Sequence, residues 1–536
     1  MRWTPEGQTT LLDLLAEASS KWPDKTFIDL SGEKYSYREF DRITTQIASG
    51  FAKLGVKQGD RICSLLDNGS AQLFAWFASN KLGAILVPIN TDLKGEFLRH
   101  QMSDADASII VVEPHYEERV SAIRNELPSL KTIVVNGTVK AVDPGAIDFS
   151  SLRVDGEISH PVKVSPEDLS LLLYTSGTTG PSKGCMASHN YLRNFGLRLS
   201  QSAGYMHDDV VGTPCPLFHI AALAAIVVGG LTVGATVAIQ PRFSPATFWT
   251  EVEQSGMTVI LLLSVMLTII PDQPDNESSV RYRGKLRTVF GAPVSRAISK
   301  KWKERFAITH VGEIGFGQTE VTPIIFNRVE GPELPDGAAG KAHDDFEVKL
   351  IDENGEECKI GQPGEILVRP RRPNIMFQGY WRRPEATIAA MKDYWYHTGD
   401  MGRFDESGYF YFYDRKKDYL RKGGENVSTF ELEAAFRKHP AIAEVAAHAV
   451  FSEVSEDEVK ITAVRRSDAS LTEEELCIWC LDHVPHFAVP RYIEFRSGLP
   501  KTPTGRVQKF LLRDDGVTKE TWDRRKSTVV VKRQRQ

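Results

Sequence analysis

Cysteine is scarce in this sequence, with six residues in a chain of 536. Such sparse cysteines cannot form the disulfide framework of a small secreted domain and favour a reducing compartment, the cytoplasm. Cys477 and Cys480 form a lone Cys-x-x-Cys in a stretch of helical spacing that starts at Thr472. A zinc site needs two further ligands at suitable spacing, and none is evident. We therefore interpret this pair as part of one packed helix face.

A strong charge imbalance is also missing. The formal net charge of −5 argues against nucleic acid or an anionic membrane as the main partner. The N-terminus has no apolar core of a signal peptide. The stretch Ile220–Ile239 carries no charge and is long enough for a membrane span, but Gly229, Gly230 and Gly234 interrupt it. We expect a buried helix there, followed by a turn and a core strand, and no membrane span.

Internal repeats and low-complexity tracts are absent, and the chain is too long for a single core. Helical and strand patterns alternate up to Val112, which predicts parallel sheets covered by helices. The expected elements are a helix from the capping box Ser36–Glu39 to Gly55, strands near Arg61–Leu66, Ala84–Pro88 and Ser108–Val112, and helices near Ala71–Leu82 and Gly95–Met102. Thr258–Leu263 and Leu286–Phe290 repeat the buried-strand pattern.

Between Gly331 and Tyr413 the pattern changes to short alternating runs separated by turns, which indicates a small antiparallel, barrel-like module. The charged run Asp414–Asp418 then interrupts it and is our expected domain boundary. Beyond it, Ser428–Glu431 gives a second capping box. We thus predict an α/β fold: a large N-terminal domain over 1–414 with parallel-rich sheets flanked by helices and the module at 331–413, a small mobile α+β domain over 415–517, and a tail over 518–536.

The most distinctive segment is Tyr174–Gly184, which has three glycines, five Ser/Thr hydroxyls, one lysine and no acid. Glycines let backbone N–H groups turn toward an anion, hydroxyls add donors, and Lys183 adds a mobile positive charge. The apolar run before it, Leu171–Tyr174, has the pattern of a buried strand. The loop does not fit the Walker pattern, because Lys183 follows Gly180 by three positions and precedes Gly184. The segment therefore predicts a polyphosphate site but not a P-loop kinase.

This loop resembles the phosphate-binding loop of the acyl-adenylate-forming (AMP-binding) superfamily, which includes the acyl-CoA synthetases. Five further segments fit the superfamily pattern in its order: Gly291–Pro293, Gly315–Glu320, His397–Asp400, Asp414–Arg415, and Leu499–Gly505 with Arg506. The resemblance implies an ATP-dependent acyl-CoA ligase. A carboxylate attacks the α-phosphate of magnesium ATP to give an acyl-adenylate and diphosphate, and the thiol of coenzyme A then displaces AMP. Positioning and cationic stabilisation carry such a reaction.

The resemblance also implies roles for individual residues. Gly291–Pro293 would form one wall of the adenine site, Phe316 would supply a stacking ring where the family usually has tyrosine, and Asp400 would accept both ribose hydroxyls. Glu320 is the expected Mg²⁺ ligand, because Mg²⁺ prefers hard oxygen when it bridges phosphates. The full ATP/AMP set is Thr175, Ser176, Gly177, Thr178, Thr179, Lys183, Gly291, Ala292, Pro293, Gly315, Phe316, Gly317, Gln318, Thr319, Asp400, Arg415 and Arg506.

The family performs its two steps in two poses of the small domain, and four positions follow from that. Lys417 matches the hinge, and Arg421, Gly423 and Gly424 match the loop that approaches the coenzyme A tunnel. Most relatives have lysine after the glycine of the C-terminal loop, whereas this chain has Arg506. Three readings are open: Arg506 serves, Lys509 reaches in one helical turn later, or adenylation is slow. We favour Arg506, and we count Lys183, Glu320, Arg506 and Lys509 as the catalytic candidates.

The sequence gives the least information about which carboxylic acid is activated. Amino-acid-activating relatives carry an aspartate in the segment that matches Phe218–His219, and here His219 stands instead, which indicates an acyl pocket. The alternative is a buried histidine of structural value. The stretches Phe243–Trp249, Tyr411–Thr429 and Leu261–Phe290 resemble the crotonobetaine/carnitine-CoA ligase group. Medium-chain, aryl and bile-acid-like acids remain open as well.

Two rival functions are compatible with the same fold. The first is another enzyme of the same fold, an acyl-AMP ligase or a luciferase-like oxygenase. The second is a nucleotide-binding pseudoenzyme, against which Lys183, Glu320, Asp400 and Arg415 argue. No carrier domain follows the C-terminal loop, which favours free coenzyme A as the thiol. The expected setting is cytoplasmic fatty-acid metabolism, with a small-molecule acid and coenzyme A as partners; a homodimer is left open.

Overall fold

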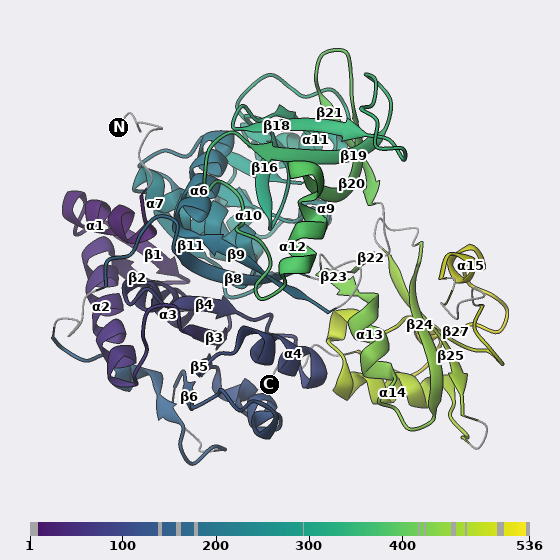
Figure 1. The fold of residues 1–536 in the computed structure, drawn as a ribbon. Coiled ribbons are helices and arrows are strands. Elements are labelled where there is room, and N and C mark those ends of the chain that lie inside the picture. The colour runs from purple at the N-terminus through teal and green to yellow at the C-terminus, as the bar shows by residue number, and fades with distance from the viewer. Residues whose placement is uncertain are drawn as a thin grey trace.

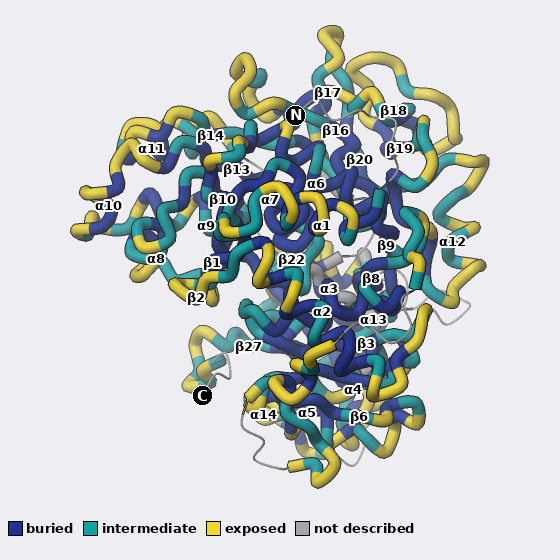
Figure 2. Tube along the Cα trace, turned by 90° about the vertical axis from the view of Figure 1, so that its left-hand side faces the viewer, coloured by how far each residue is buried: buried dark blue, intermediate teal, exposed yellow. Residues whose placement is uncertain are grey.

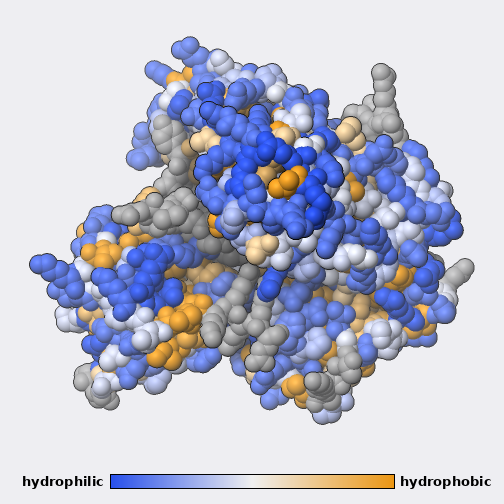
Figure 3. Space-filling view, turned by 180° about the vertical axis from the view of Figure 1, so that it is seen from behind, coloured by the Kyte–Doolittle hydropathy of each residue, from blue (hydrophilic) through white to orange (hydrophobic). Residues whose placement is uncertain are grey.

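The structure is a computed structural model that describes residues 9–137, 142–156, 162–175, 181–292, 294–415, 419–422, 425–451, 457–466, 469–500, 507 and 509–531. Figure 1 shows a large N-terminal part built from sheets and helices, and a small C-terminal part beside it that contains α13, α14 and β24–β27. The surface seen from behind is mostly hydrophilic, with apolar side chains gathered in small groups (Figure 3).

The described strands of the N-terminal part form two seven-stranded sheets. The first has the order β7-β6-β5-β3-β4-β8-β9, and the second has the order β14-β13-β12-β10-β11-β1-β2. Among the described residues, the strands of each sheet pair in parallel except at one edge, where β8 meets β9 and β1 meets β2. The strands of the first sheet are β3 (Arg61–Leu65), β4 (Ile85–Pro88), β5 (Ile109–Val112), β6 (Thr132–Val135), β7 (Ile147–Asp148), β8 (Leu169–Thr175) and β9 (Lys183–Ser188). Those of the second are β1 (Thr26–Leu30), β2 (Glu33–Ser36), β10 (Val210–Thr213), β11 (Thr236–Ile239), β12 (Val259–Leu261), β13 (Thr288–Gly291) and β14 (His310–Glu313).

One continuous apolar core joins strands of both sheets to helices α2, α3 and α6. Figure 2 shows the buried residues running through these elements. The helices of this part are α1 (Leu11–Lys21), α2 (Tyr37–Lys53), α3 (Ser70–Lys81), α4 (Gly95–Ala105), α5 (Glu117–Ser121), α6 (His189–Ala203), α7 (Gly229–Val233), α8 (Phe248–Ser255), α9 (Ser264–Ile269), α10 (Glu277–Arg281) and α11 (Arg296–Phe306). The parallel-rich α/β architecture predicted from the alternating patterns is confirmed.

The local signals explain individual elements. The Ser36 side chain accepts the Glu39 N–H while Glu39 accepts the Ser36 N–H, so α2 begins at the predicted capping box. The uncharged stretch Ile220–Ile239 folds as the π-helix η4 (Ala221–Val228), α7 and β11, with Gly234 in the left-handed conformation between helix and strand. Across the described residues, none of the helices has both the length and the apolar character that a membrane span requires.

The region after β14 is antiparallel from β15 onward, which confirms that the fold contains an antiparallel module, while the bounds 331–413 stay a prediction. One sheet has the order β15-β16-β17 and another the order β18-β19-β20-β21. Their bounds are β15 (Gly315–Gln318), β16 (Val321–Phe326), β17 (Lys341–Ala342), β18 (Phe346–Ile351), β19 (Gly364–Pro370), β20 (Tyr396–Phe404) and β21 (Phe410–Arg415), and α12 (Pro384–Ala390) lies between β19 and β20.

The small C-terminal domain is α+β, as predicted. A hairpin of β22 and β23 leads into the sheet β24-β25-β26-β27. The bounds are β22 (Tyr419–Lys422), β23 (Glu425–Ser428), α13 (Thr429–Phe436), β24 (Ile442–Val450), β25 (Glu458–Arg465), α14 (Glu473–His483), β26 (Tyr492–Phe495), α15 (Lys509–Asp514) and β27 (Trp522–Asp523). Cys477 and Cys480 are both buried on α14, and the described residues contain no cluster of His, Cys, Asp and Glu that could hold a metal. The burial of both thiols confirms the predicted packed face.

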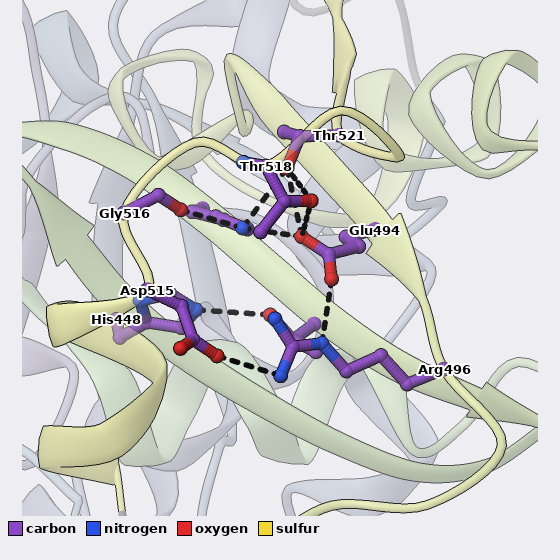
Figure 4. A network of polar contacts seen from close by, with 9 residues as sticks. His448, Glu494, Arg496, Asp515, Gly516, Thr518 and Thr521 are labelled. Atoms are coloured by element: carbon purple, nitrogen blue, oxygen red, sulfur yellow. Dashed lines mark hydrogen bonds and ion pairs between the residues drawn. The ribbon is translucent and has the colours of Figure 1, made fainter.

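A buried polar network fastens the segment after Gly516 to this sheet (Figure 4). Lys460 is fully buried, and its ammonium lies 2.5 Å from a Glu494 oxygen, 2.7 Å from the Gly516 carbonyl and 3.0 Å from the Thr521 hydroxyl. Glu494 also accepts hydrogen bonds from Thr518 and Thr521. Because Lys460 stands on β25, Glu494 on β26, and the other partners on the segment that leads into β27, the network ties the two strands to that segment.

Candidate functional site

Thr175 and Lys183 face each other at the loop end of the β8–β9 hairpin. They are cross-strand partners and bracket the predicted phosphate loop, of which Ser176, Gly177, Thr178, Thr179 and Gly180 lie outside the described residues. The Lys183 ammonium lies 4.7 Å from the centre of the Tyr380 ring. Burial lowers the pKa of Lys183, and the nearby Glu320 carboxylate opposes that shift. The lysine is thus held in a partly desolvated, aromatic-faced position.

Glu320 is buried at the turn between β15 and β16, within hydrogen-bond reach of the β8–β9 hairpin. Its Oε1 accepts hydrogen bonds from the Thr175 hydroxyl at 3.3 Å and from the Tyr380 hydroxyl at 3.0 Å. Tyr380 therefore contacts Lys183 through its ring and Glu320 through its hydroxyl. The sequence pattern gave no indication of Tyr380, because a lone tyrosine in the loop before α12 carries no recognisable motif.

Two glycines make the β15–β16 hairpin possible. Gly315 has a φ of +117°, and a Cβ there would lie 1.9 Å from the Ile325 carbonyl oxygen. A Cβ on Gly317 would lie 1.9 Å from the Thr322 hydroxyl. Because neither neighbour leaves room for a side chain, both predicted site positions require glycine for steric reasons. Thr319 completes the turn, and its carbonyl accepts a 2.9 Å hydrogen bond from Tyr191 of α6.

The third group of predicted residues meets between β15, β20 and β21. The Gln318 amide donates to Asp400, which is buried on β20, and to the Thr398 carbonyl at 2.8 Å. Tyr396 in turn donates to Gln318 at 2.8 Å. Asp400 lies opposite Arg415 in the β20–β21 register, which brings these two predicted nucleotide-binding positions together at the level of the backbone. Nothing is described of the Arg415 side chain.

An aromatic pair borders this group. The ring of Phe316 stacks on that of Phe412, with centroids 5.5 Å apart and an interplanar angle of 28°. Phe412 is 44% exposed and Phe316 is half-buried. The ring expected to stack on a base thus already lies flat against a second, exposed ring.

The predicted adenine wall follows β13. Gly291 ends that strand, and a Cβ there would lie 2.2 Å from the Leu262 carbonyl oxygen. Ala292 comes next, and Pro293 lies outside the described residues. Glu313, the cross-strand partner of Gly291, accepts the Val294 N–H at 3.0 Å. Burial raises the pKa of Glu313 to about 7, against the opposing effect of that hydrogen bond. The sequence did not reveal this carboxyl, because it sits within an ordinary strand pattern.

The predicted acyl segment lies at the start of η4. The rings of Phe218 and His219 lie 4.7 Å apart, and both residues are half-buried. The His219 carbonyl accepts the Leu223 N–H, and Ile220 separates the histidine from the π-helix. Asn68, after β3, donates to the Cys215 carbonyl at 3.0 Å and accepts the Leu217 N–H at 2.8 Å. One amide side chain from the first sheet thus holds the segment in place.

The predicted residues of the small domain are only partly described. The Lys509 ammonium lies 2.9 Å from the Thr429 hydroxyl and 2.6 Å from a Glu433 oxygen, so it is engaged inside the small domain. Arg421 lies on β22, and nothing is described of its side chain. Lys417, Gly423, Gly424 and Arg506 lie outside the described residues.

Comparisons with known proteins cover both parts of the fold. The model of the AMP-binding enzyme family matches residues 15–381, and the model of the AMP-binding enzyme C-terminal domain matches residues 431–506. A crotonobetaine/carnitine–CoA ligase of Escherichia coli (O6:K15:H31, strain 536) is 29% identical over 479 residues, 88% of this chain and 92% of that protein.

Two solved structures are similar over almost their full length. The anthranilate CoA ligase AuaEII in complex with anthranoyl-AMP has a TM-score of 0.71 at 25% identity and covers 94% of this chain and 97% of its own. The o-succinylbenzoate CoA synthetase of Bacillus subtilis has a TM-score of 0.80 at 22% identity, with 94% and 99% coverage, and supports the fold alone.

Proposed function

Because the chain belongs to the AMP-binding enzyme family, we propose how its own residues carry out the reaction of that family. The predicted superfamily resemblance and the predicted reaction class are confirmed by the matches. The chain is an ATP-dependent acid–CoA ligase that works through an acyl-adenylate, with ATP, coenzyme A and a small-molecule carboxylic acid as its reactants. We propose roles for single residues, a metal ligand and a class of acid.

The observation that carries the assignment is the cluster of Lys183, Tyr380, Glu320 and Thr175. We assign Lys183 to the phosphates of ATP, where its positive charge would stabilise the departing diphosphate. Glu320 would bind Mg²⁺, because its buried carboxylate supplies hard oxygen and is oriented by two hydroxyls. When bound, Mg²⁺ would neutralise phosphate charge. The residues that orient Glu320 are then Thr175 and Tyr380.

The nucleotide would lie across the remaining predicted residues. Asp400 and Arg415 are assigned to ribose and phosphate, Gly291, Ala292 and Pro293 to one face of adenine, and Phe316 to the other. In the first half-reaction an oxygen of the acid attacks the α-phosphorus, and the bond to the diphosphate breaks. In the second, the thiol of coenzyme A attacks the acyl carbon, and the bond to AMP breaks. The support is the register that pairs Asp400 with Arg415.

We assign the cation that meets the substrate carboxylate to Arg506. The support is indirect: Lys509, the rival, is engaged with Thr429 and Glu433. We also propose Lys417 as the hinge, and the loop of Arg421, Gly423 and Gly424 as the one that approaches the coenzyme A tunnel. Arg506→Ala should then lower adenylation far more than thioester formation from supplied acyl-adenylate. Equal losses in both steps would reject the assignment.

For the acid we propose an acyl substrate without an α-ammonium group, because His219 stands where amino-acid-activating relatives have aspartate. The following segment, η4, is uncharged and buried, which suits an apolar acyl chain. Carnitine-like, medium-chain, aryl and bile-acid-like acids are the candidates. The free state of all six cysteines supports a cytoplasmic setting, and a homodimer is a hypothesis for sedimentation analysis.

The test is a panel of carboxylic acids incubated with ATP, Mg²⁺ and coenzyme A, read by the mass of the thioester. We expect one class of acids to give both diphosphate and a thioester. Without coenzyme A, the same acids should give acyl-adenylate. Lys183→Ala, the negative control, should abolish diphosphate release. An adenylate that never becomes a thioester would indicate an acyl-AMP ligase, and no diphosphate with any acid would indicate a pseudoenzyme.

A further inference from the structure

A carboxylate of the small domain is bound to the edge of the phosphate loop. Glu431 on α13 accepts the backbone N–H of Ser182 at 2.7 Å. Ser182 is buried and immediately precedes Lys183. A side chain from the small domain therefore takes a backbone donor next to the lysine that we assign to ATP phosphates.

Helix α4 shapes the surroundings of this contact. His100 lies 2.9 Å from the Ser182 carbonyl through its Nε2, and the Gln101 amide lies 3.4 Å from the Ser182 hydroxyl. Burial raises the pKa of Glu431, while the Ser182 hydrogen bonds and the nearby His100 act in the opposite direction. The carboxylate is thus held in a confined site whose donors come from the N-terminal part.

Helix α4 and the residues just before it carry further polar contacts to the small domain. The Lys438 ammonium lies 2.5 Å from a Glu96 oxygen, and His486 Nδ1 lies 3.2 Å from Asp92. Lys94, which caps α4, donates to the Leu481 carbonyl. These contacts define one pose of the small domain, and among them Glu431 touches the residue next to Lys183.

We propose that Glu431 is a positioning residue that makes this pose and bound ATP mutually unfavourable. Its negative charge occupies the Ser182 N–H beside Lys183, so a polyphosphate at Lys183 meets electrostatic repulsion and a missing donor. The proposal rests on the assignment of ATP phosphates to Lys183. Because coupling is reciprocal, ATP disfavours the pose by the same factor by which the pose weakens ATP. Departure of the diphosphate then lets Glu431 return, which orders the two half-reactions.

The test uses Glu431→Gln, which keeps an oxygen acceptor for Ser182 and removes the charge. Calorimetry with Mg²⁺ and ATP, in the absence of any acid, measures ATP affinity without turnover. We expect ATP to bind about fivefold more tightly to this variant than to the wild type, the scale of one like-charge contact in a partly screened site. Glu520→Gln is the control, because it makes the same charge change at an exposed position of the small domain.

A second readout follows the pose itself. Glu96→Cys with Lys438→Cys allows a short thiol crosslink across the observed ion pair. Five native cysteines are buried, so Cys358→Ser removes the sixth, half-buried thiol. In this background ATP should lower the crosslinked fraction when Glu431 is present and lower it much less with Glu431→Gln. Glu431→Ala, which removes charge and acceptor together, should crosslink poorly even without ATP.

The possible outcomes distinguish the proposed antagonism between Glu431 and ATP, which we call the gate, from the ligase function on which it rests. If Glu431→Gln and Glu520→Gln bind ATP equally well and lose crosslinking equally with ATP, the gate is overturned while the ligase remains. If the wild type takes up no ATP at all, the assignment of Lys183 is overturned and the gate with it. Crosslinking of Glu431→Ala at the wild-type level would also reject the gate, since the contact would then not hold the pose.

Discussion

At the scale of single residues, Tyr380 joins the two charged groups of the site. Its ring faces Lys183 and its hydroxyl donates to Glu320. Tyr380→Phe keeps the ring and removes that hydrogen bond, so Glu320 loses one of its two orienting hydroxyls. A hydrogen bond to a charged group is worth about 1.5–3 kcal/mol, and we expect adenylation to slow by about tenfold or more.

The measurement is the rate of diphosphate release at saturating acid and ATP. Tyr394→Phe is the matched control, because Tyr394 is 87% exposed and this change likewise removes only a phenolic hydroxyl. A Tyr380→Phe rate equal to that of the control would show that Glu320 does not need its partner.

Glu313 gives a second residue-scale prediction, this one for pH dependence. Burial raises its pKa in the folded protein to about 7, so the folded state binds the proton more tightly than the unfolded state does. Stability should therefore fall as the pH rises from about 4.5 through 7, where the unfolded chain has already lost this proton. Glu313→Gln keeps an acceptor for the Val294 N–H and removes the titration.

We expect Glu313→Gln to raise the free energy of unfolding by about 1 kcal/mol or more at pH 8 and to change it little at pH 5. Chemical denaturation at both pH values measures this difference. Equal effects at the two pH values would contradict it.

What the sequence reveals at this scale is limited to residues inside motifs. Lys183, Glu320 and Asp400 stand in recognisable strings, and the structure brings Lys183 and Glu320 to the same cluster. Tyr380 and Glu313 were missed because each gains its meaning from a partner supplied by another strand or loop. A lone tyrosine and a strand glutamate look ordinary until the fold brings Glu320 and Val294 to them.

At the scale of elements, Gly315 gives a direct test of the glycines on which the β15–β16 hairpin depends. Gly315 combines a positive φ with a backbone oxygen, that of Ile325, where a Cβ would lie. Gly355 also has a positive φ, of +86°, but nothing lies within 4 Å of its Cβ position. A comparison of the two glycines therefore distinguishes the cost of backbone strain from the cost of steric overlap.

Gly355→Ala should cost about 1 kcal/mol of unfolding free energy through strain alone. Gly315→Ala should cost about 3 kcal/mol or more, because a backbone carbonyl cannot move aside cheaply. Equilibrium denaturation measures both values. Since Glu320 sits on the turn of this hairpin, Gly315→Ala should also slow diphosphate release, whereas Gly355→Ala should not. Similar unfolding costs for the two variants would contradict the steric argument.

The elements themselves were largely predictable, because their signals are local. The capping box at Ser36, the strand at Arg61–Leu65 and the break at Gly234 appear in the structure close to where the patterns put them. The π-helical form of η4 was not predictable, because a stretch that is apolar on all sides gives no periodicity to distinguish one helix type from another. The order of strands in the sheets was also out of reach, since pairings such as β1 with β11 join residues far apart in the chain.

At the scale of the whole molecule, the segment after Gly516 completes the small domain. The sequence predicted a separate tail over 518–536, and that boundary remains a proposal. β27 nevertheless pairs with β26, and Figure 4 shows Thr518 and Thr521 bound to Glu494. Although burial alone would raise the pKa of Glu494, the bonds from Lys460, Arg496 and Thr521 lower it to about 2. A charged pair therefore stays intact in the sheet interior down to strongly acidic pH.

Lys460→Met tests whether this pair holds the domain together. The change leaves Glu494 buried without its main counter-charge and frees the Gly516 carbonyl, so we expect a loss of about 3–5 kcal/mol in unfolding free energy. Because the network lies within the small domain, protease cleavage should begin there while the N-terminal part stays folded. Lys519→Met is the control, since Lys519 is exposed in the same segment. ATP binding by the N-terminal part should survive in both variants, whereas thioester formation should fail in Lys460→Met alone. Simultaneous unfolding of both parts in Lys460→Met would instead mean that the small domain has no separate stability.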